Sequence, residues 1–282
     1  MEGEEGTFEE LTPEEIERIV RVAVKLGINK VKLTGGEPLI RGDIEEVVRR
    51  LSHINGMEEV SLTTNGSLLK EKVEELAKAK LKRINVNIPS LREKVYKYVT
   101  NSEYSPQQII EGVIEAKRLG INPIKVNMVI LKGINDDQID EMITFTKKND
   151  LILQLIELEN VGVSEEIYSK YHVDVSSIEE KIKLEAENVI VRRNMQNRRR
   201  YILRGGGEIE IVRPYEDGSF CSACTRLRLT ADGKIKPCLM RNDNLINLKD
   251  LLRKKLDDYE LVKCFVKAIE GREPYWKKKI TP

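Results

Sequence analysis

Apolar side chains recur at helical spacing and in short strand-like runs, in alternation, over the first 160 residues. Residues 12–15, Thr-Pro-Glu-Glu, have the form of a capping box with proline at the first helical position. They predict a helix that ends near Gly27 and whose apolar face includes Ile16, Ile19, Val20 and Val24. Further helices are expected over residues 44–53, 71–79, 106–119 and 137–148, and strands over residues 30–34, 59–64, 83–88, 124–131 and 151–158.

Short strands that alternate with helices of this length predict an α/β fold with a parallel sheet, either open or barrel-like. The run begins with a helix, although a strand should precede the first helix of a regular βα array. Only a loop-like acidic stretch over residues 1–10 precedes it, so the initiating strand is missing. After residue 160 the pattern changes to a polar segment, a β-rich segment over residues 201–238 with a turn at 205–207, and one or two terminal helices. We therefore expect a βα region over residues 1–160 and a C-terminal region over residues 161–282.

Composition narrows the class of protein. Lys+Arg 48 against Asp+Glu 47 gives a net charge of +1 over 282 residues, which argues against a general nucleic-acid platform. No apolar run approaches the ~20 residues needed to cross a bilayer, and no signal-peptide pattern opens the chain. Clustered cysteines without such a signal fit a reducing compartment and a metal site better than disulfides. We expect a cytoplasmic protein.

The cysteines carry the most specific signal. Cys221, Cys224 and Cys238 hold three of the four cysteines of the chain within one short stretch. A Cys-x2-Cys pair can direct two thiolates to one metal centre, and residues 231–234, Ala-Asp-Gly-Lys, predict a hairpin turn that brings Cys238 beside them. Three thiolates suit either an iron–sulfur cluster with one open iron or a zinc site completed elsewhere. The spacing alone leaves both alternatives open.

Loops at the carboxyl ends of the expected strands are candidate ligand sites. Residues 35–38, Gly-Gly-Glu-Pro, would let the backbone approach a ligand, and Glu37 could hold an amine, although an isolated motif of this kind is more often an ordinary turn. Residues 63–66, Thr-Thr-Asn-Gly, and Asn87 offer polar groups at the next two strand ends, where turns are again the alternative.

Alternation within the strands selects further candidates. If Val126 and Met128 face the helices, Lys125 and Asn127 point inward, and a buried lysine requires an anion or a carboxylate. Glu157 is a candidate for a similar inward position. Arg226 and Arg228 project from one strand face beside the cysteines, either to hold a phosphate or carboxylate or as solvated side chains.

Other polar features have simpler interpretations. Cys264 shares a helical face with apolar residues and is expected in the core, and neither His53 nor His172 is a strong metal-ligand candidate. The basic run over residues 192–200 could help to hold a polyphosphate or bind RNA, but a solvated surface is the default interpretation.

Taken together and in this order, six segments resemble the GTP 3′,8-cyclase family of radical S-adenosylmethionine enzymes, which begin molybdenum cofactor biosynthesis. They are Lys-Leu-Thr-Gly-Gly-Glu-Pro-Leu at 32–39, Leu-Thr-Thr-Asn-Gly at 62–66, Arg-Ile-Asn-Val-Asn at 83–87, Lys-Val-Asn-Met-Val at 125–129, Lys-Gly-Ile-Asn-Asp-Asp at 132–137 and the cysteine stretch at 221–239. The cysteine stretch is the most specific of them, because its spacing includes the embedded Thr-Arg-Leu-Arg.

The resemblance implies an α/β fold with a partial βα barrel, a C-terminal hairpin and helical region, and two [4Fe–4S] clusters. One cluster binds S-adenosylmethionine and yields the 5′-deoxyadenosyl radical, which takes the ribose 3′ hydrogen of GTP so that the sugar carbon attacks C8 of guanine. The other cluster, on Cys221, Cys224 and Cys238, holds guanine at its open iron. The matching GTP-binding positions are Lys32, Thr63, Lys125, Arg226 and Arg228, and the matching S-adenosylmethionine contacts are Gly36 and Asn87.

Several positions depart from the family pattern. Lys32 stands where arginine is common, Asn87 where serine is usual, and Glu159 where many members have methionine. The largest departure is that the Cys-x3-Cys-x2-Cys ligands of the first cluster do not occur in this sequence. Because the substrate-side residues are present, we expect a chain that has lost the N-terminal segment of a complete enzyme, rather than a naturally short relative. We expect this polypeptide to bind its C-terminal cluster but to make no radical.

The resemblance also implies partners. They are GTP, an electron donor and a downstream cyclic pyranopterin monophosphate synthase, without membrane or nucleic acid, for a monomer or homodimer. Two alternatives remain, namely a non-catalytic relative that binds GTP and a cluster, and an unrelated α/β protein with a structural zinc site.

Overall fold

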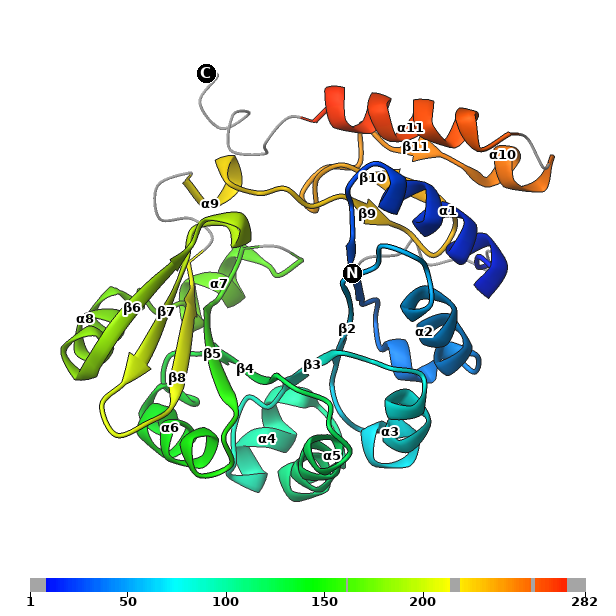
Figure 1. Ribbon diagram of the computed structural model, residues 1–282. Coiled ribbons are helices and arrows are strands. Elements are labelled where there is room, and N and C mark those ends of the chain that lie inside the picture. Colours follow the sequence, from blue (N-terminus) through cyan, green and yellow to red (C-terminus); the bar gives the residue numbers. More distant parts are fainter. Residues whose placement is uncertain (1–8, 161, 214–218, 255–256, 273–282) are drawn as a thin grey trace, which may run out of the picture.

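Helices and strands alternate through the first half of the chain in the computed structural model, which describes residues 9–160, 162–213, 219–254 and 257–272 (Figure 1). The elements of this half are α1 (Pro13–Lys25), β1 (Lys30–Leu33), α2 (Ile44–Ser52), β2 (Glu59–Thr64), α3 (Leu69–Lys78), β3 (Arg83–Asn87), α4 (Glu93–Thr100), α5 (Pro106–Arg118), β4 (Ile124–Ile130), α6 (Ile139–Lys148) and β5 (Ile152–Glu157), with short 3₁₀ turns at Pro38–Ile40 and Asp136–Gln138. The expected helices and strands are all present.

Two local features explain how this run begins and where prediction was incomplete. The capping box is confirmed, because Thr12 Oγ1 accepts a hydrogen bond from Glu15 N at 3.3 Å while Glu15 Oε2 accepts one from Thr12 N at 2.9 Å. Helix α4 was not predicted: it is only eight residues long, and Tyr96 is its one fully buried residue. The predicted loop over residues 1–10 lies mostly outside the described residues.

The strands form one open, curved sheet. Its order is β1-β2-β3-β4-β5-β8-β7-β6, in which β1 to β5 and β8 are parallel while β7 and β6 are antiparallel to their neighbours. The three later strands are β6 (Ala186–Arg192), β7 (Arg198–Leu203) and β8 (Glu208–Val212). Among the described elements β1 and β6 are the edges of the sheet, so it does not close into a barrel. The predicted α/β class is confirmed, and the boundary predicted at residue 160 stays a prediction.

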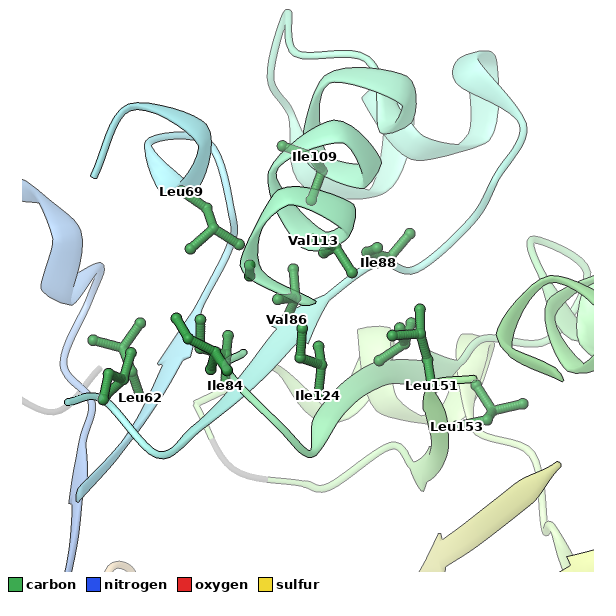
Figure 2. Packing of buried hydrophobic residues seen from close by; sticks show 14 of the residues in the cluster. Leu62, Leu69, Ile84, Val86, Ile88, Ile109, Val113, Ile124, Leu151 and Leu153 are labelled. Atoms are coloured by element: carbon green, nitrogen blue, oxygen red, sulfur yellow. The ribbon is translucent and has the colours of Figure 1, made fainter. Parts of the chain in front are cut away.

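Apolar residues cover the convex side of this sheet. Val126, Met128 and Ile130 of β4 belong to the main hydrophobic core, as do buried residues of helices α2, α3, α5 and α6 (Figure 2). Lys125 and Asn127 therefore face the concave side, as the alternation predicted. Complete burial of such aliphatic side chains contributes about 1.5–3 kcal/mol each, so this core fixes which strand residues point to the concave side.

The remaining helices and strands come from the second half of the chain. Helices α7 (Glu165–Tyr171) and α8 (Ser176–Glu185) precede β6, and after β8 come α9 (Ser219–Ser222), β9 (Arg228–Leu229), β10 (Lys234–Lys236), β11 (Ile246–Asn247), α10 (Lys249–Arg253) and α11 (Asp258–Glu270). Strands β9 to β11 form a small antiparallel sheet that packs with α10 and α11 against α1 (Figure 1). The predicted hairpin turn is confirmed by the bond from Thr230 N to Lys234 O at 2.9 Å.

Candidate functional site

Two loops at the carboxyl ends of β1 and β2 are joined by Glu37. Its Oε1 accepts hydrogen bonds from Leu39 N at 3.0 Å and Thr64 Oγ1 at 2.6 Å, and its Oε2 accepts one from Asn65 N at 2.6 Å. The carboxylate thus holds the two loops together. These contacts give Glu37 a structural role, and the amine contact suggested by the sequence stays a prediction.

Glycines in these loops have different roles. A Cβ on Gly66 would lie 2.5 Å from Ile109 Cγ2 and 3.0 Å from Val86 Cγ1, so only glycine fits against α5 there. By contrast, a Cβ on Gly36 would meet no atom within 4 Å, and Gly36 is exposed. The backbone at Gly36 is therefore open to approach by a ligand, as its predicted cofactor contact requires.

Polar side chains of neighbouring strands lie in two adjacent rows on the concave side. Thr63, Asn85 and Lys125 are paired in register in one row, and Asn87, Asn127 and Gln154 in the other, where Asn127 Nδ2 donates to Asn87 Oδ1 at 3.0 Å. The oxygens of three buried amides in these rows have no hydrogen-bond partner among the described residues; they are Asn85 Oδ1, Asn127 Oδ1 and Gln154 Oε1. Buried acceptors without partners have a free-energy cost, so this face fits a polar ligand that donates hydrogen bonds.

The centre of the concave side is a buried cluster of charges around Glu210 of β8. Its side chain is fully buried and pairs with Lys125 Nζ, with Arg192 Nη1 at 2.8 Å and with Arg198 Nη1 at 3.3 Å. Burial opposes ionisation of Glu210, but Lys125, Arg198 and Arg192 outweigh it and lower the pKa of Glu210 to about 2. The prediction that Lys125 points inward to a carboxylate is confirmed.

Further cations face the same concave side of the sheet, the hollow in which Glu210 lies. Desolvation, followed by the charges of Arg83, Arg226 and Arg198, lowers the pKa of Lys32, although its side chain still reaches solvent. Burial and the nearby Arg198 likewise lower the pKa of Arg226 to about 10. Arg226 precedes β9 and is half-buried, so it is not a fully solvated residue on a strand face, one of the two alternatives that the sequence left open.

Glu159, after β5, lies near the arginines of the cysteine stretch. Burial raises the pKa of Glu159, while the charges of Arg198, Arg228 and Arg226 act in the opposite direction. Arg226 and Arg228 thus sit within electrostatic reach of the end of β5 and of β7. The C-terminal hairpin and the sheet therefore contribute charged groups to a single region.

The basic run over residues 192–200 corrects a prediction. Arg192 and Arg198 turn inward to Glu210, Arg199 pairs with Glu179 at 3.0 Å, and Arg200 pairs with a second glutamate of β8 at 3.1 Å. The default interpretation as a solvated surface is wrong for Arg192, Arg198 and Arg200, whereas Arg199 is exposed, as that interpretation expects. Strand alternation over residues 198–203 was the signal that could have shown it.

The cysteine stretch is partly buried. Cys224 N donates to Cys221 O at 3.2 Å, and burial followed by the nearby Cys224 and Cys238 raises the pKa of the Cys221 thiol. The Cys224 and Cys238 thiols therefore lie within electrostatic reach of Cys221. In the part of the chain that the structure describes, no group of three His, Cys, Asp or Glu side chains is placed to hold a metal ion, and the ligand assignment stays a prediction. Cys264 packs against the C-terminal core as expected.

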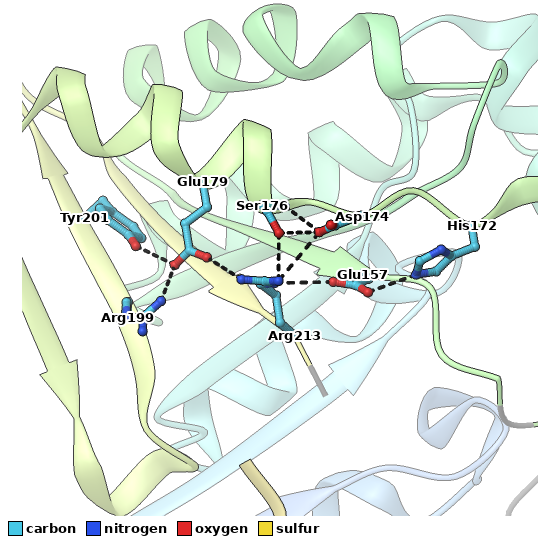
Figure 3. A network of polar contacts seen from close by, with 8 residues as sticks. All are labelled: Glu157, His172, Asp174, Ser176, Glu179, Arg199, Tyr201 and Arg213. Atoms are coloured by element: carbon cyan, nitrogen blue, oxygen red, sulfur yellow. Dashed lines mark hydrogen bonds and ion pairs between the residues drawn. The ribbon is translucent and has the colours of Figure 1, made fainter. Parts of the chain in front are cut away.

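A second polar network lies on the helix-covered side of β7 and β8 (Figure 3). Glu157 shares its register level with Ile130 of the main core, and it bonds His172 Nε2 at 2.9 Å and pairs with Arg213 Nε at 3.5 Å. The suggestion that Glu157 faces inward is therefore wrong, because its position in β5 places it on the convex side. The network also includes Glu179 of α8, which pairs with Arg199 and Arg213.

Comparison with known proteins identifies the family. Residues 2–146 match the model of the radical SAM superfamily, and residues 151–278 match that of Molybdenum Cofactor Synthesis C. A probable GTP 3′,8-cyclase of Thermococcus kodakarensis is 45% identical over 273 residues, which cover 95% of this chain and 87% of that protein. One of Methanocella arvoryzae is 41% identical over 276 residues, or 98% of this chain and 85% of that protein.

This chain belongs to the GTP 3′,8-cyclase family. Members of this radical SAM family act in molybdenum cofactor biosynthesis, and the resemblance drawn from the six sequence segments is confirmed. The family implies a [4Fe–4S] cluster and S-adenosylmethionine. An unrelated α/β protein with a structural zinc site is thereby excluded.

Solved structures agree on the fold of this GTP 3′,8-cyclase family member. Streptococcus suis SuiB aligns with a TM-score of 0.65 at 22% identity over 88% of this chain and 60% of that chain. Native anSMEcpe with bound AdoMet and Cp18Cys peptide aligns with a TM-score of 0.58 at 14% identity over 90% of this chain and 75% of that chain. At these identities the likeness concerns the fold alone. In the described residues, no helix has the length and apolar character to cross a membrane.

Proposed function

We propose that this chain binds GTP in the concave hollow and serves the GTP 3′,8-cyclase reaction, in which the ribose C3′ of GTP loses its hydrogen and bonds to C8 of guanine. The observation that carries the proposal is the convergence of cations on this face, from Lys32 of β1 to Arg226 beside the cysteines. A nucleotide triphosphate supplies the negative charge that such a face lacks.

Each proposed substrate contact has a defined place. Lys125 is held by Glu210, Thr63 is half-buried in the same row, and Arg226 and Arg228 come from the cysteine hairpin. We assign Lys32 with these four residues to GTP. Gly36 and Asn87, at the ends of β1 and β3, are assigned to S-adenosylmethionine, since the first offers open backbone and the second an exposed amide.

Three cysteines are the proposed cluster ligands. Cys221 and Cys224 lie on a tight turn and Cys238 follows the hairpin, and three thiolates are a donor set that suits a [4Fe–4S] cluster with one open iron. When bound, this cluster would hold guanine, as the family resemblance implies. The remaining cysteine, Cys264, packs in the C-terminal core, so the chain offers no Cys-x3-Cys-x2-Cys ligands for the cluster that generates the radical, and we derive no step through it.

The residues of this chain can bind and orient. The cations fix the phosphates while the cysteine hairpin fixes the base, so the ribose between them is held against the carboxyl ends of β1 to β3, where the proposed S-adenosylmethionine contacts lie. Such positioning lowers the entropic barrier of the reaction. We further propose a cytoplasmic monomer or homodimer that works with an electron donor and with the downstream cyclic pyranopterin monophosphate synthase.

Anaerobic reconstitution with iron and sulfide tests the cluster assignment. We expect one [4Fe–4S] cluster per chain, loss of that cluster in the variants Cys221→Ser, Cys224→Ser and Cys238→Ser, and full retention in the control Cys264→Ser. GTP should broaden or shift the electron paramagnetic resonance signal of the reduced wild-type cluster. Zinc in place of iron, or iron retained in all three variants, would contradict the assignment. Two clusters per chain, or 5′-deoxyadenosine production, would contradict the prediction that this polypeptide makes no radical.

A further inference from the structure

Two arginines that no resemblance assigns to the substrate converge on the centre of the hollow. Arg192 ends β6 and Arg198 begins β7, and the two residues are paired in register. Both donate to Glu210, Arg192 Nη1 at 2.8 Å and Arg198 Nη1 at 3.3 Å, beside Lys125. One fully buried carboxylate thus holds three cations that come from three strands.

This cluster has more positive than negative charge. Lys125, Arg192 and Arg198 share the single carboxylate of Glu210, and Arg198 is also within electrostatic reach of Lys32. Like charges gathered in a low-dielectric site are destabilising unless an anion joins them. The excess of cations therefore indicates that the hollow is built to receive a multiply charged anion.

Arg198 also has the orientation and the donors for such a role. Its Nη2 donates to Gln196 Oε1 at 3.0 Å, and its guanidinium lies over the ring of Phe220 at 5.6 Å from the centroid. Its Nε is buried and has no hydrogen-bond partner among the described residues. Because Phe220 precedes Cys221, this stacking ties the arginine to the segment that is proposed to hold guanine.

We propose that Arg192 and Arg198 bind the phosphate chain of the nucleotide, and that Glu210 is a positioning residue that holds both guanidinium groups and Lys125 at the phosphate site. The inference rests on the proposed function, and it adds a phosphate site formed by β6, β7 and β8 to the contacts taken from the resemblance. Arginine suits this role because its planar guanidinium can meet two phosphate oxygens at once.

The test compares neighbouring arginines on opposite faces of β7. Arg198→Gln removes the inward charge, whereas the control Arg199→Gln removes a charge that pairs with Glu179 on the convex side. Calorimetry on anaerobically reconstituted protein should measure the affinities for GTP, GDP, GMP and guanosine, together with competition by inorganic tripolyphosphate. Circular dichroism and thermal unfolding show which variants are folded, and Arg192→Gln is a second inward variant at a more exposed position.

We expect Arg198→Gln to weaken GTP binding about 10- to 100-fold, the range of a lost charge-assisted hydrogen bond. The loss should decrease in the order GTP, GDP, GMP, and guanosine binding should change by less than about threefold. Tripolyphosphate should compete with GTP on the wild type and only weakly on Arg198→Gln. Arg198→Lys should recover part of the affinity, since lysine keeps the charge without the planar fork.

Glu210→Gln tests the positioning role separately. We expect it to weaken GTP binding while leaving guanosine binding unchanged, a selectivity that a general loss of structure would not produce. Equal losses for GTP and guanosine, or the same loss in Arg199→Gln, would overturn the phosphate site while GTP binding by the wild type still supports the proposed function. A wild-type protein without affinity for GTP overturns both.

Discussion

The two faces of strands β7 and β8 carry charge networks of different kinds. On the convex side, Glu179 accepts from Tyr201 Oη at 2.5 Å and from Arg199 at 3.0 Å, and it pairs with Arg213 at 3.2 Å (Figure 3). Arg213 in turn meets the carboxylates of Glu157 and Asp174. There, three carboxylates meet two arginines.

On the concave side the balance differs. Glu210 is the carboxylate that pairs with Lys125, Arg192 and Arg198, Glu159 acts on Arg198 only through longer-range charge, and several buried donors and acceptors around Glu210 have no partner among the described residues. In a buried network whose charges are paired, loss of one partner leaves another charge uncompensated and destabilises the fold. A network with excess charge and open hydrogen-bonding groups needs a ligand to complete it. We therefore propose that the convex network stabilises the fold, whereas the concave cations bind the substrate.

The largest difference between the two networks is expected from Glu179→Gln, which should affect stability and not GTP binding. Removing one member of a buried charged network typically costs about 3–5 kcal/mol, so the free energy of unfolding should fall by about 3 kcal/mol, measured by denaturant titration. GTP affinity should stay within about twofold of the wild type. If Glu179→Gln kept its stability but lost GTP binding, the structural role of the convex network would be contradicted.

The pH dependence of that effect has a definite sign. Burial opposes the ionisation of Glu179, but Tyr201, Arg199 and Arg213 together lower its pKa. A carboxylate with a lowered folded pKa contributes its full stability above the unfolded pKa, about 4.3. The stability difference between the wild type and Glu179→Gln should therefore be constant near neutral pH and shrink as the pH falls below that value.

More of the fold than of the candidate site could be predicted from the sequence. Periodicity gave the alternation of helices and strands and the inward direction of Lys125, because both depend on neighbouring residues. The partner Glu210 is 85 residues away from Lys125 in the chain, and it becomes a neighbour only because β8 inserts beside β5. For the same reason the inward turn of Arg192 and Arg198 could not be read from a basic run, which local composition cannot distinguish from a solvated surface.

The next largest effect is expected from Lys125→Met. This change removes the most deeply buried cation of the hollow and leaves Glu210 with its two arginines. We expect GTP affinity to fall about 30-fold, or about 2 kcal/mol, as for one lost charged hydrogen bond. Titration calorimetry with GTP and guanosine measures the loss, and Lys183→Met on the exposed face of α8 is the control. Equal weakening of guanosine would show that the lysine shapes the hollow rather than holding phosphate.

The smallest predicted effect concerns Lys32 and pH. Desolvation and the charges of Arg83, Arg226, Arg198 and Lys125 lower its pKa to about 7. A bound phosphate favours the protonated amine, so GTP binding takes up a proton above this pH and the affinity should fall a few-fold, at most about tenfold, between pH 7 and 8.

Lys32→Arg isolates this contribution, because a guanidinium keeps its charge throughout that range. Titration of the nucleotide's own phosphates is common to both proteins and cancels in their ratio. The ratio of the GTP affinity of Lys32→Arg to that of the wild type should therefore rise from pH 7 to pH 8. The other charged residues of the concave side are the same in both proteins. A ratio that stays constant with pH would mean that Lys32 is already protonated in the free protein. In that case the excess of positive charge on the concave side would include a full charge on β1.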